Sequence, residues 1–280
     1  MQLSVMTFNL RRQTTKDGGN AWTFRKTYAA DIVKRYRPTV AGTQEGFREM
    51  LTVLEQQLPG YAWIGEGRNE GSADEHNAIL YLTEELEVAD WGQFWLSEHP
   101  EGPVAKCWGA SHHRICTWAH FRSRQDPDRQ FLHYNTHLDH SSQEAREKGV
   151  RLLWQRLSDH RARTGLPVLL TGDMNAEPDN PAIAYLRGQS DPGSENRSLT
   201  DAYSILTEPP GTSFHSFEGG AEGEPIDYIF GTSEVRFDDV CIIRDQYDGI
   251  YPSDHYPVAA KATLSGSPVQ AAKREGGESA

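Results

Sequence analysis

Several features are scarce in this chain of 280 residues. Its three cysteines, Cys107, Cys116 and Cys241, show no metal-binding spacing and leave one thiol unpaired in any disulfide scheme. No apolar run is long enough to cross a bilayer. Residues 1–11 lack the basic leader and the small-residue cleavage site of a signal peptide, so we expect a strand there. These absences favour a reduced, cytoplasmic protein without a membrane span.

Basic residues are fewer than acidic residues in this chain. The chain has 28 Lys and Arg against 40 Asp and Glu, a formal net charge of −12. Long polynucleotides are bound largely through phosphate neutralisation by basic side chains. The acidic balance therefore favours a small substrate, although nucleic acid stays possible if a local basic groove exists.

Two common functional patterns are missing as well. The chain has no G-x-S-x-G motif, which would mark the nucleophile of a serine hydrolase. The glycine-rich stretch 65–71 (GEGRNEG) misses the spacing of both the dinucleotide-binding and the Walker motifs, and no helical pattern follows it. We therefore expect a loop at residues 65–71.

What the chain does contain is a succession of short β-prone runs. Their β-branched and aromatic content predicts strands at residues 3–8, 39–43, 61–64, 78–83, 115–121, 132–138, 168–171, 226–230 and 256–264. Helical periodicity predicts helices at residues 24–36, 49–58 and 142–163, the last capped by Ser142. This pattern favours two packed sheets with helices outside, although one doubly wound sheet also fits. We expect one domain over residues 1–264 and a disordered tail over residues 265–280.

Five short polar motifs follow or interrupt the strand-like runs. In chain order they hold Asn9 in MTFNL, Gln44 and Glu45 in TQEG, Asp173 and Asn175 in TGDMN, Asp227 in IDYIF, and Asp254 and His255 in SDHYPV. Strand ends carry chemistry in layered proteins, because strands fix positions while their ends stay open to ligand. Carboxylates, amides and a histidine gathered there can hold a hard divalent cation and direct water onto phosphorus. The sequence therefore predicts a metal-dependent phosphoester hydrolase.

Each polar motif also has an ordinary interpretation. Asp173 and Asn175 would share one face of a strand, yet such residues also form Asx-turns. Glu45 offers the hard oxygen that Mg²⁺ or Mn²⁺ prefers, although a glutamate by itself is usually just exposed. Asp227 would fix the tautomer of an imidazole beside it, and the SDH motif needs a turn to bring His255 into a site. The combination, rather than any single motif, indicates chemistry.

The segment YNTHLDH admits two interpretations. His137, Asp139 and His140 resemble part of a zinc-binding motif of the metallo-β-lactamase type, but the further histidine that this motif requires is Asn135 here. The alternative, which we favour, places His137 at a strand end as a phosphate-facing acid. Asp139 and His140 then support it or cap the helix that follows.

Two further residues are candidates for substrate binding. Arg114 begins a strand after a polar loop and can clamp a phosphate in bidentate fashion, whereas a surface arginine is the alternative. Trp108 can stack on a substrate. The aromatic group around it, which consists of Trp91, Phe94, Trp95 and Trp108, is more simply interpreted as core.

Taken together, these motifs resemble the endonuclease/exonuclease/phosphatase superfamily, with its deoxyribonuclease-I-like fold, over residues 2–264. The segments NAWTFRK, FWLSE, RICTWA, NTHLDH and SFHSF are similar to small bacterial members related to the deadenylase and nocturnin branch. The resemblance implies an α+β fold, a four-layer αββα sandwich with the site at one end of the two sheets. It also implies Mg²⁺ or Mn²⁺ and in-line attack of water on a phosphoester.

The resemblance further implies a division of labour among the polar residues. Glu45 would be the principal metal ligand, with Asn9 and Asp254 close to it. Asp173 would orient and deprotonate the attacking water, and Asn175 would bind a phosphoryl oxygen.

Two histidines complete the implied machinery. His255, paired with Asp227, and His137 would stabilise the charge that develops on the phosphoryl group, and which of them donates the proton stays open. The superfamily includes nucleases, sphingomyelinases and several phosphatases, so the substrate is not fixed by the fold. We expect a small phosphoester such as a nucleotide, a sugar phosphate or a short oligonucleotide end, and we assume a monomer. A nuclease is the alternative, and a catalytically inactive binding module is the alternative of another class.

Overall fold

The computed structural model describes residues 1–69, 71, 74–102, 105–190 and 198–265. The elements used below are β1 (Gln2–Asn9), α1 (Trp22–Tyr36), β2 (Val40–Gln44), α2 (Arg48–Gln57), β3 (Tyr61–Ile64), β4 (Ile79–Leu82), β5 (Leu86–Trp95), β6 (Ile115–Ser123), β7 (Gln130–His137), α3 (Gln143–Thr164), β8 (Val168–Asp173), α4 (Pro181–Leu186), β9 (Thr200–Asp201), β10 (Asp227–Gly231), β11 (Val235–Ile242) and β12 (Val258–Leu264). Short 3-10 helices cover Thr15–Asn20 and Ala202–Ile205. The tail expected over residues 265–280 lies almost entirely outside the described residues.

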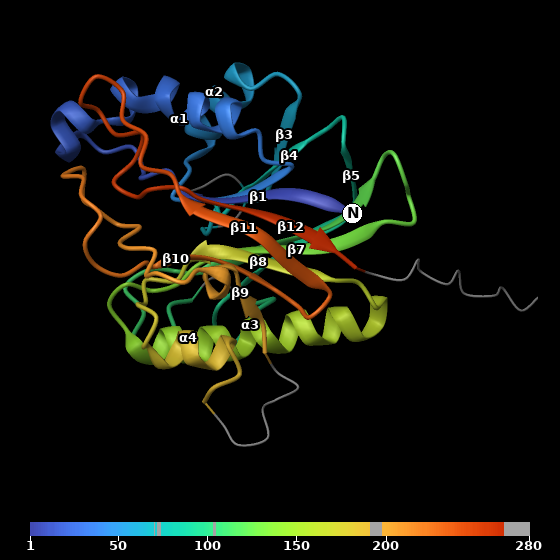
Figure 1. Cartoon of the computed structure of the whole chain (residues 1–280). Coiled ribbons are helices and arrows are strands. Elements are labelled where there is room, and N and C mark those ends of the chain that lie inside the picture. The colour runs from blue at the N-terminus through green and yellow to red at the C-terminus, as the bar shows by residue number, and fades with distance from the viewer. Residues whose placement is uncertain (70, 72–73, 103–104, 191–197, 266–280) are drawn as a thin grey trace, which may run out of the picture.

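The strands form two sheets of six strands each. The first has the order β11-β12-β1-β2-β4-β3, and the second has the order β5-β6-β7-β8-β10-β9. Helices α1 and α2 cover the outer face of the first sheet, and α3 and α4 cover the outer face of the second (Figure 1). The predicted four-layer αββα sandwich is therefore confirmed, and a single doubly wound sheet is excluded.

Alternation along β1 shows how the sequence builds two cores. Leu3 and Val5 belong to the large apolar cluster between the sheets and under α3. Met6 and Phe8 point the other way, into the cluster shared with α1 and α2. Successive side chains of a strand face opposite sides, so one strand serves both layers.

The helix α3 follows the predicted pattern closely. Ser142 is its N-cap, and the Ser142 hydroxyl accepts a hydrogen bond from the Ala145 amide at 3.2 Å. The helix ends at Gly165, whose φ of 69° lies in the left-handed region that glycine adopts at low cost. These two caps set the length of the helix that covers the second sheet.

A polar seam joins the two sheets near the middle of the molecule. The Gln44 amide donates to Oδ1 of Asn135 at 2.8 Å, and the Asn135 amide donates to the backbone oxygen of Thr43 at 2.8 Å. Gly42 allows this approach, because a Cβ there would lie 2.1 Å from Oγ1 of Thr171. The seam fixes β2 of the first sheet against β7 and β8 of the second.

The sequence pattern did not predict β5, β11 and α4, and each omission has a physical reason. Strand β11 carries a bulge between Phe237 and Asp239, which interrupts the apolar alternation that marks a strand. Strand β5 is an edge strand with its own register shift and a partly exposed face. The expectation that Trp91 belongs to the core is wrong, since it is 39% exposed on this edge strand, whereas Phe94 is buried. The short helix α4 is too brief to show periodicity.

Among the described residues, no helix combines the length and the apolar character needed to cross a membrane.

Candidate active site

The polar motifs meet at one edge of the two sheets. Asn9 ends β1, beside the end of the parallel strand β2 that leads into Glu45. His137 ends β7 and lies next to Asp173, the last residue of the parallel strand β8. Asp227 begins β10, which runs antiparallel to β8, and is paired with Asp173 in register. Strand order and register therefore bring residues far apart in sequence to a common place.

Of these residues, Glu45, His137 and Asp173 line a cavity of about 490 Å³, and Asn9 and Asp227 lie behind its wall. Its walls combine carboxylates, basic side chains and two phenylalanines. The lining consists of Arg11, Arg12, Asp17, Glu45, Arg68, Glu75, His112, Arg114, His137, His140, Asp173, Asn175, Phe214, Ser216, Phe217, Asp254 and His255. The cavity thus has the size of a small-molecule site and a largely polar character.

The buried Asn9 connects two carboxylates that line this cavity. Its side-chain nitrogen donates to Oδ2 of Asp173 at 2.9 Å and to Oε1 of Glu45 at 3.1 Å. The backbone amide of Arg12 donates to the second oxygen of Glu45 at 3.0 Å. Burial opposes the charged form of Glu45, yet these hydrogen bonds hold its pKa below the usual range.

His255 and Asp227 form a buried pair beside Asp173. Nδ1 of His255 lies 2.8 Å from Oδ2 of Asp227, and the Ser213 hydroxyl donates to the same oxygen at 2.7 Å. Nε2 of His255 lies 3.7 Å from Oδ2 of Asp173. Burial opposes the imidazolium, but the two carboxylates outweigh it and raise the pKa of His255 to about 10. The imidazole is therefore charged at neutral pH, as the predicted pairing requires.

Asp173 and Asn175 line the cavity through a turn rather than through strand alternation. Strand β8 ends at Asp173, and Asn175 follows with a φ of 45°. The Asn175 amide donates to Oδ1 of Asp173 at 2.9 Å, which is the Asx-turn that the sequence also allowed. Burial, reinforced by Asp227, raises the pKa of Asp173 to about 7.

His137 differs from His255 in its charge state. It lies with Nε2 3.4 Å from Oδ2 of Asp173. Burial lowers its pKa well below the usual range, and the positive charge of Arg114 lowers it further. His137 is therefore neutral at the pH at which His255 is charged, so the two histidines are not interchangeable.

The acidic side of the cavity suits a divalent cation. Burial raises the pKa of Asp254, and the negative charge of Glu45 raises it further. Neighbouring carboxylates that disfavour each other's charged form gain from a cation bound near them. The only donors they offer are hard oxygens, which match Mg²⁺ or Mn²⁺. At present Arg11 supplies positive charge, with Nη1 3.5 Å from Oδ2 of Asp254.

The match to known proteins agrees with this geometry. The model of the endonuclease/exonuclease/phosphatase family matches residues 6–255, nearly the whole described fold. The chain belongs to this family. Its members are phosphoester hydrolases that generally depend on a divalent metal, so the chain has a hydrolase fold of that kind.

Several solved structures share the fold of this chain. A mannosyl-6-phosphatase from Bacteroides thetaiotaomicron VPI-5482 is 29% identical with a TM-score of 0.85, covering 94% of this chain and 100% of its own. The human nocturnin catalytic domain is 18% identical with a TM-score of 0.72, covering 94% of each chain. TDP2 from D. rerio, complexed with a single-strand DNA product, is 15% identical with a TM-score of 0.72, covering 94% of this chain and 99% of its own. A search of curated proteins gives no match.

Of the two predicted substrate-binding residues, only Arg114 lines the cavity of this family member. Arg114 is buried rather than a surface residue, with Nε 3.4 Å from Oδ2 of Asp139 and Nη2 3.1 Å from Nδ1 of His140. Trp108 instead lines a neighbouring hollow of about 540 Å³ together with Lys148. Its indole nitrogen donates to Glu98 at 3.2 Å.

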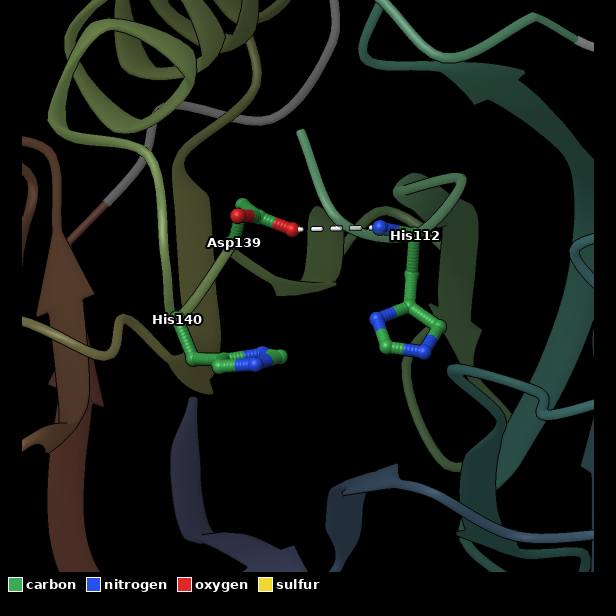
Figure 2. Close-up of side chains that lie close together, drawn as sticks. All are labelled: His112, Asp139 and His140. Carbon is green, nitrogen blue, oxygen red and sulfur yellow. Dashed lines mark hydrogen bonds between the residues drawn. The ribbon is translucent and has the colours of Figure 1, made fainter. Parts of the chain in front are cut away.

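The histidines considered for zinc are arranged differently from the sequence motif. His137 faces Asp173, whereas the rings of His112 and His140 face each other near Asp139, with centroids 5.6 Å apart (Figure 2). Oδ2 of Asp139 accepts hydrogen bonds from the Ser111 amide at 3.0 Å and the Ser111 hydroxyl at 2.8 Å. Its Oδ1 accepts two backbone amides at the start of α3. These bonds engage both oxygens of Asp139 in holding the loop and the helix start.

Sequence reasoning missed several residues that line the cavity. Arg68 and Glu75 form a buried ion pair of 2.8 Å, and Arg12 approaches Glu75 at 3.4 Å. Arg68 lies in the glycine-rich stretch that was predicted as a loop, and a basic residue among glycines was the available signal. Phe214 of the SFHSF segment packs against His255, with ring centroids 4.9 Å apart and ring planes tilted by 57°. No period or spacing in the sequence marks it.

Proposed function

We propose that this protein is a divalent-metal-dependent hydrolase that attacks the phosphoryl group of a small phosphoester with an activated water. One observation carries the proposal: Oδ2 of Asp173 accepts a hydrogen bond from Asn9, which also holds Glu45, and lies 3.7 Å from Nε2 of the charged His255. A carboxylate held between a cation site and an imidazolium is placed to accept a proton from water. Sugar phosphates are the first candidates, because the mannosyl-6-phosphatase is 29% identical over its whole length.

The cation would be held by Glu45 and Asp254, with Asn9 fixing Glu45. Bound there, Mg²⁺ or Mn²⁺ would neutralise phosphoryl charge as a Lewis acid. Asp173 orients the water and accepts its proton, and its pKa near 7 suits that task at neutral pH. Asn175 lines the cavity, and its side-chain nitrogen, which donates to the backbone oxygen of Leu138 at 3.0 Å, would also bind a phosphoryl oxygen.

The charge states of the two histidines suggest which one donates a proton. His255 is protonated at neutral pH because the adjacent carboxylates support its charge, so it can stabilise the phosphoryl oxygens and protonate the leaving oxygen. His137 is neutral and donates a hydrogen bond instead. Arg114, in the same cavity, adds a fixed positive charge near the substrate.

A nuclease is the second candidate, but the charges of the cavity give it less support. Arg68 and Arg12 both face Glu75, and Arg114 faces Asp139. Each of these basic groups therefore has an acidic partner that weakens its attraction for a polyanion, and the whole chain carries a charge of −12. The likeness to TDP2, at 15% identity, concerns the fold alone.

A substrate panel tests the proposal directly. Mannose 6-phosphate, glucose 6-phosphate, a nucleoside monophosphate, bis(p-nitrophenyl) phosphate and a short oligonucleotide are incubated with the protein and Mn²⁺. We expect the monoesters to be hydrolysed fastest, and Asp173→Asn serves as the control for contaminating phosphatase. Turnover of the diester and the oligonucleotide alone would overturn the small-monoester assignment and favour a nuclease.

The salt dependence of KM separates the two candidates further. A protein that contacts six to ten phosphates loses about 10³–10⁵-fold in affinity between 50 and 200 mM salt. We expect KM for the best substrate to change by less than about tenfold over that range at constant Mn²⁺. A steep slope would favour a polynucleotide substrate.

A further inference from the structure

Arg25 on α1 is a charged side chain that lies entirely inside the protein. It is 0% exposed and heads the fully buried side chains by volume. Its guanidinium carbon lies 5.2 Å from the ring centre of Trp22 and 5.7 Å from that of Phe217. A charge removed from water in this way is costly unless it is hydrogen-bonded.

Backbone oxygens supply the hydrogen bonds of Arg25 among the described residues. Nε donates to Asn20 at 2.8 Å, and Nη2 donates to Arg11 at 2.5 Å. Nη1 donates both to Leu10 and, at 3.0 Å, to Pro252. One planar group thus binds carbonyls from three separate segments of the chain.

Two of these segments carry residues of the candidate active site. Leu10 and Arg11 directly follow Asn9, and Pro252 stands two residues before Asp254. A parallel contact joins the same segments, since the Ser253 hydroxyl donates to the backbone oxygen of Asn9 at 2.7 Å. The spacing between the Asn9 segment and the Asp254 segment is therefore set by the bonds that converge on Arg25 together with the Ser253 bond.

We propose that Arg25 is a positioning residue that holds the Asn9 and Asp254 segments at the separation required for cation binding. The proposal rests on the proposed function, because it assigns the cation to Glu45 and Asp254. A buried arginine that only stabilises the fold is the competing explanation. The two explanations predict different metal affinities for a variant that still folds. A positioning role predicts weaker Mn²⁺ binding by the folded variant, whereas a purely stabilising role predicts unchanged binding.

Lysine cannot replace this arrangement. A guanidinium presents five N–H donors in one plane, whereas an ammonium is a single point with three rotating donors. Arg25→Lys keeps the charge and most of the methylene stem but cannot reach Leu10, Arg11 and Pro252 together. Loss of a group that orients metal ligands typically costs about 10–100-fold in metal affinity or activity. Arg25→Lys should therefore weaken Mn²⁺ binding by that factor.

The experiment compares wild type, Arg25→Lys, Arg25→Ala and the control Arg35→Ala. Arg35 lies on the same helix but is exposed and pairs with Asp245 at 3.0 Å. The first readout is the Mn²⁺ concentration that gives half of the metal-induced rise in Tm, measured without substrate. The second is kcat and KM for the best substrate of the panel, with and without millimolar ethylguanidinium.

We expect a 10–100-fold higher Mn²⁺ midpoint for Arg25→Lys, an unchanged midpoint for Arg35→Ala, and partial rescue of kcat in Arg25→Ala by ethylguanidinium. Equal midpoints in wild type and Arg25→Lys would overturn this proposal alone. Failure of Arg25→Lys to fold would also overturn it, since the residue would then serve folding as such. A wild-type protein without any Mn²⁺ effect would overturn the proposed function as well.

Discussion

The side-chain nitrogen of Asn9 donates a hydrogen bond to Oδ2 of Asp173 at 2.9 Å, across the boundary between the two sheets. Asn9 ends β1 of the first sheet and Asp173 ends β8 of the second. The cation side of the cavity and the proposed base are thus held in one rigid frame.

Metal dependence is the first consequence to test. Glu45→Ala removes the carboxylate that two hydrogen bonds hold in its charged form, so we expect turnover to fall by at least about 10²-fold and Mn²⁺ binding to weaken. Activity with and without excess EDTA, then with Mn²⁺ restored, is the measurement. Glu49→Ala, an exposed position on α2, is the matched control. Full activity in EDTA would contradict the metal role.

The proposed base is tested by a change that preserves shape. Asp173→Asn keeps a hydrogen-bonding group beside Asn9 but cannot accept a proton from water. We expect kcat to fall by about 10²–10⁴-fold, the usual worth of a positioned general base. The Mn²⁺ midpoint in the thermal shift should stay within about threefold. Asp179→Asn, on an exposed turn, controls for the substitution; retention of half the wild-type kcat would rule out Asp173 as the base.

Asp227 should set the position of the whole pH profile. Activity requires Asp173 deprotonated and His255 protonated, so it rises above the pKa of Asp173 and falls above that of His255. The charge of Asp227 raises both pKa values, to about 7 and about 10. In Asp227→Asn both limbs of the bell should therefore move to lower pH. Profiles of kcat/KM at fixed Mn²⁺ measure this, and an unmoved alkaline limb would show that His255 is not the titrating acid.

His133 should make folding sensitive to acid. It is 0% exposed, bonds through Nε2 to Thr171 at 2.8 Å, and burial lowers its pKa to about 3. Between that value and the unfolded value of about 6.5, the unfolded chain binds the extra proton, so stability is lost as the pH falls. One proton corresponds to about 1.4 kcal/mol per pH unit.

The measurement is the free energy of unfolding by urea at several pH values from 4 to 7. In His133→Gln the free energy of unfolding should change less steeply with pH, by an amount that corresponds to about one proton. The variant should be less stable than wild type at every pH. His99→Gln, at an exposed position, should keep the wild-type slope. An unchanged slope in His133→Gln would assign the acid sensitivity to other groups.

The sequence predicted the architecture well because its signal is local. The alternation along β1 and the caps of α3 involve residues that are close together in the sequence. The polar residues at strand ends mark the edge of the sheets where the site lies. Strand order then follows from packing that places Asn9, Asp173 and Asp227 together. The family resemblance added the roles of these residues, which spacing alone does not supply.

What the sequence could not predict depends on long-range contacts. The bulge in β11 breaks its period, and Trp91 is exposed because β5 lies at the edge of its sheet. Arg25 and Arg68 look like ordinary surface arginines until the fold buries them. Trp108 stands six positions before Arg114, yet the loop between them leads it into a different hollow.

The polar seam between the sheets has a consequence for the kinetics of the reaction. Gly42, Asn135 and Thr171 leave no room for one sheet to slide past the other, and the bonds of Asn135 would be lost without replacement. We therefore expect substrate entry and product escape to depend on the residues at the rim of the cavity, such as Arg68 and Phe214, and not on movement between the sheets. If product release is the slowest step, the turnover number will depend on solvent viscosity and on substitutions in the loops around the cavity. Substitutions inside the sheets will then change it little.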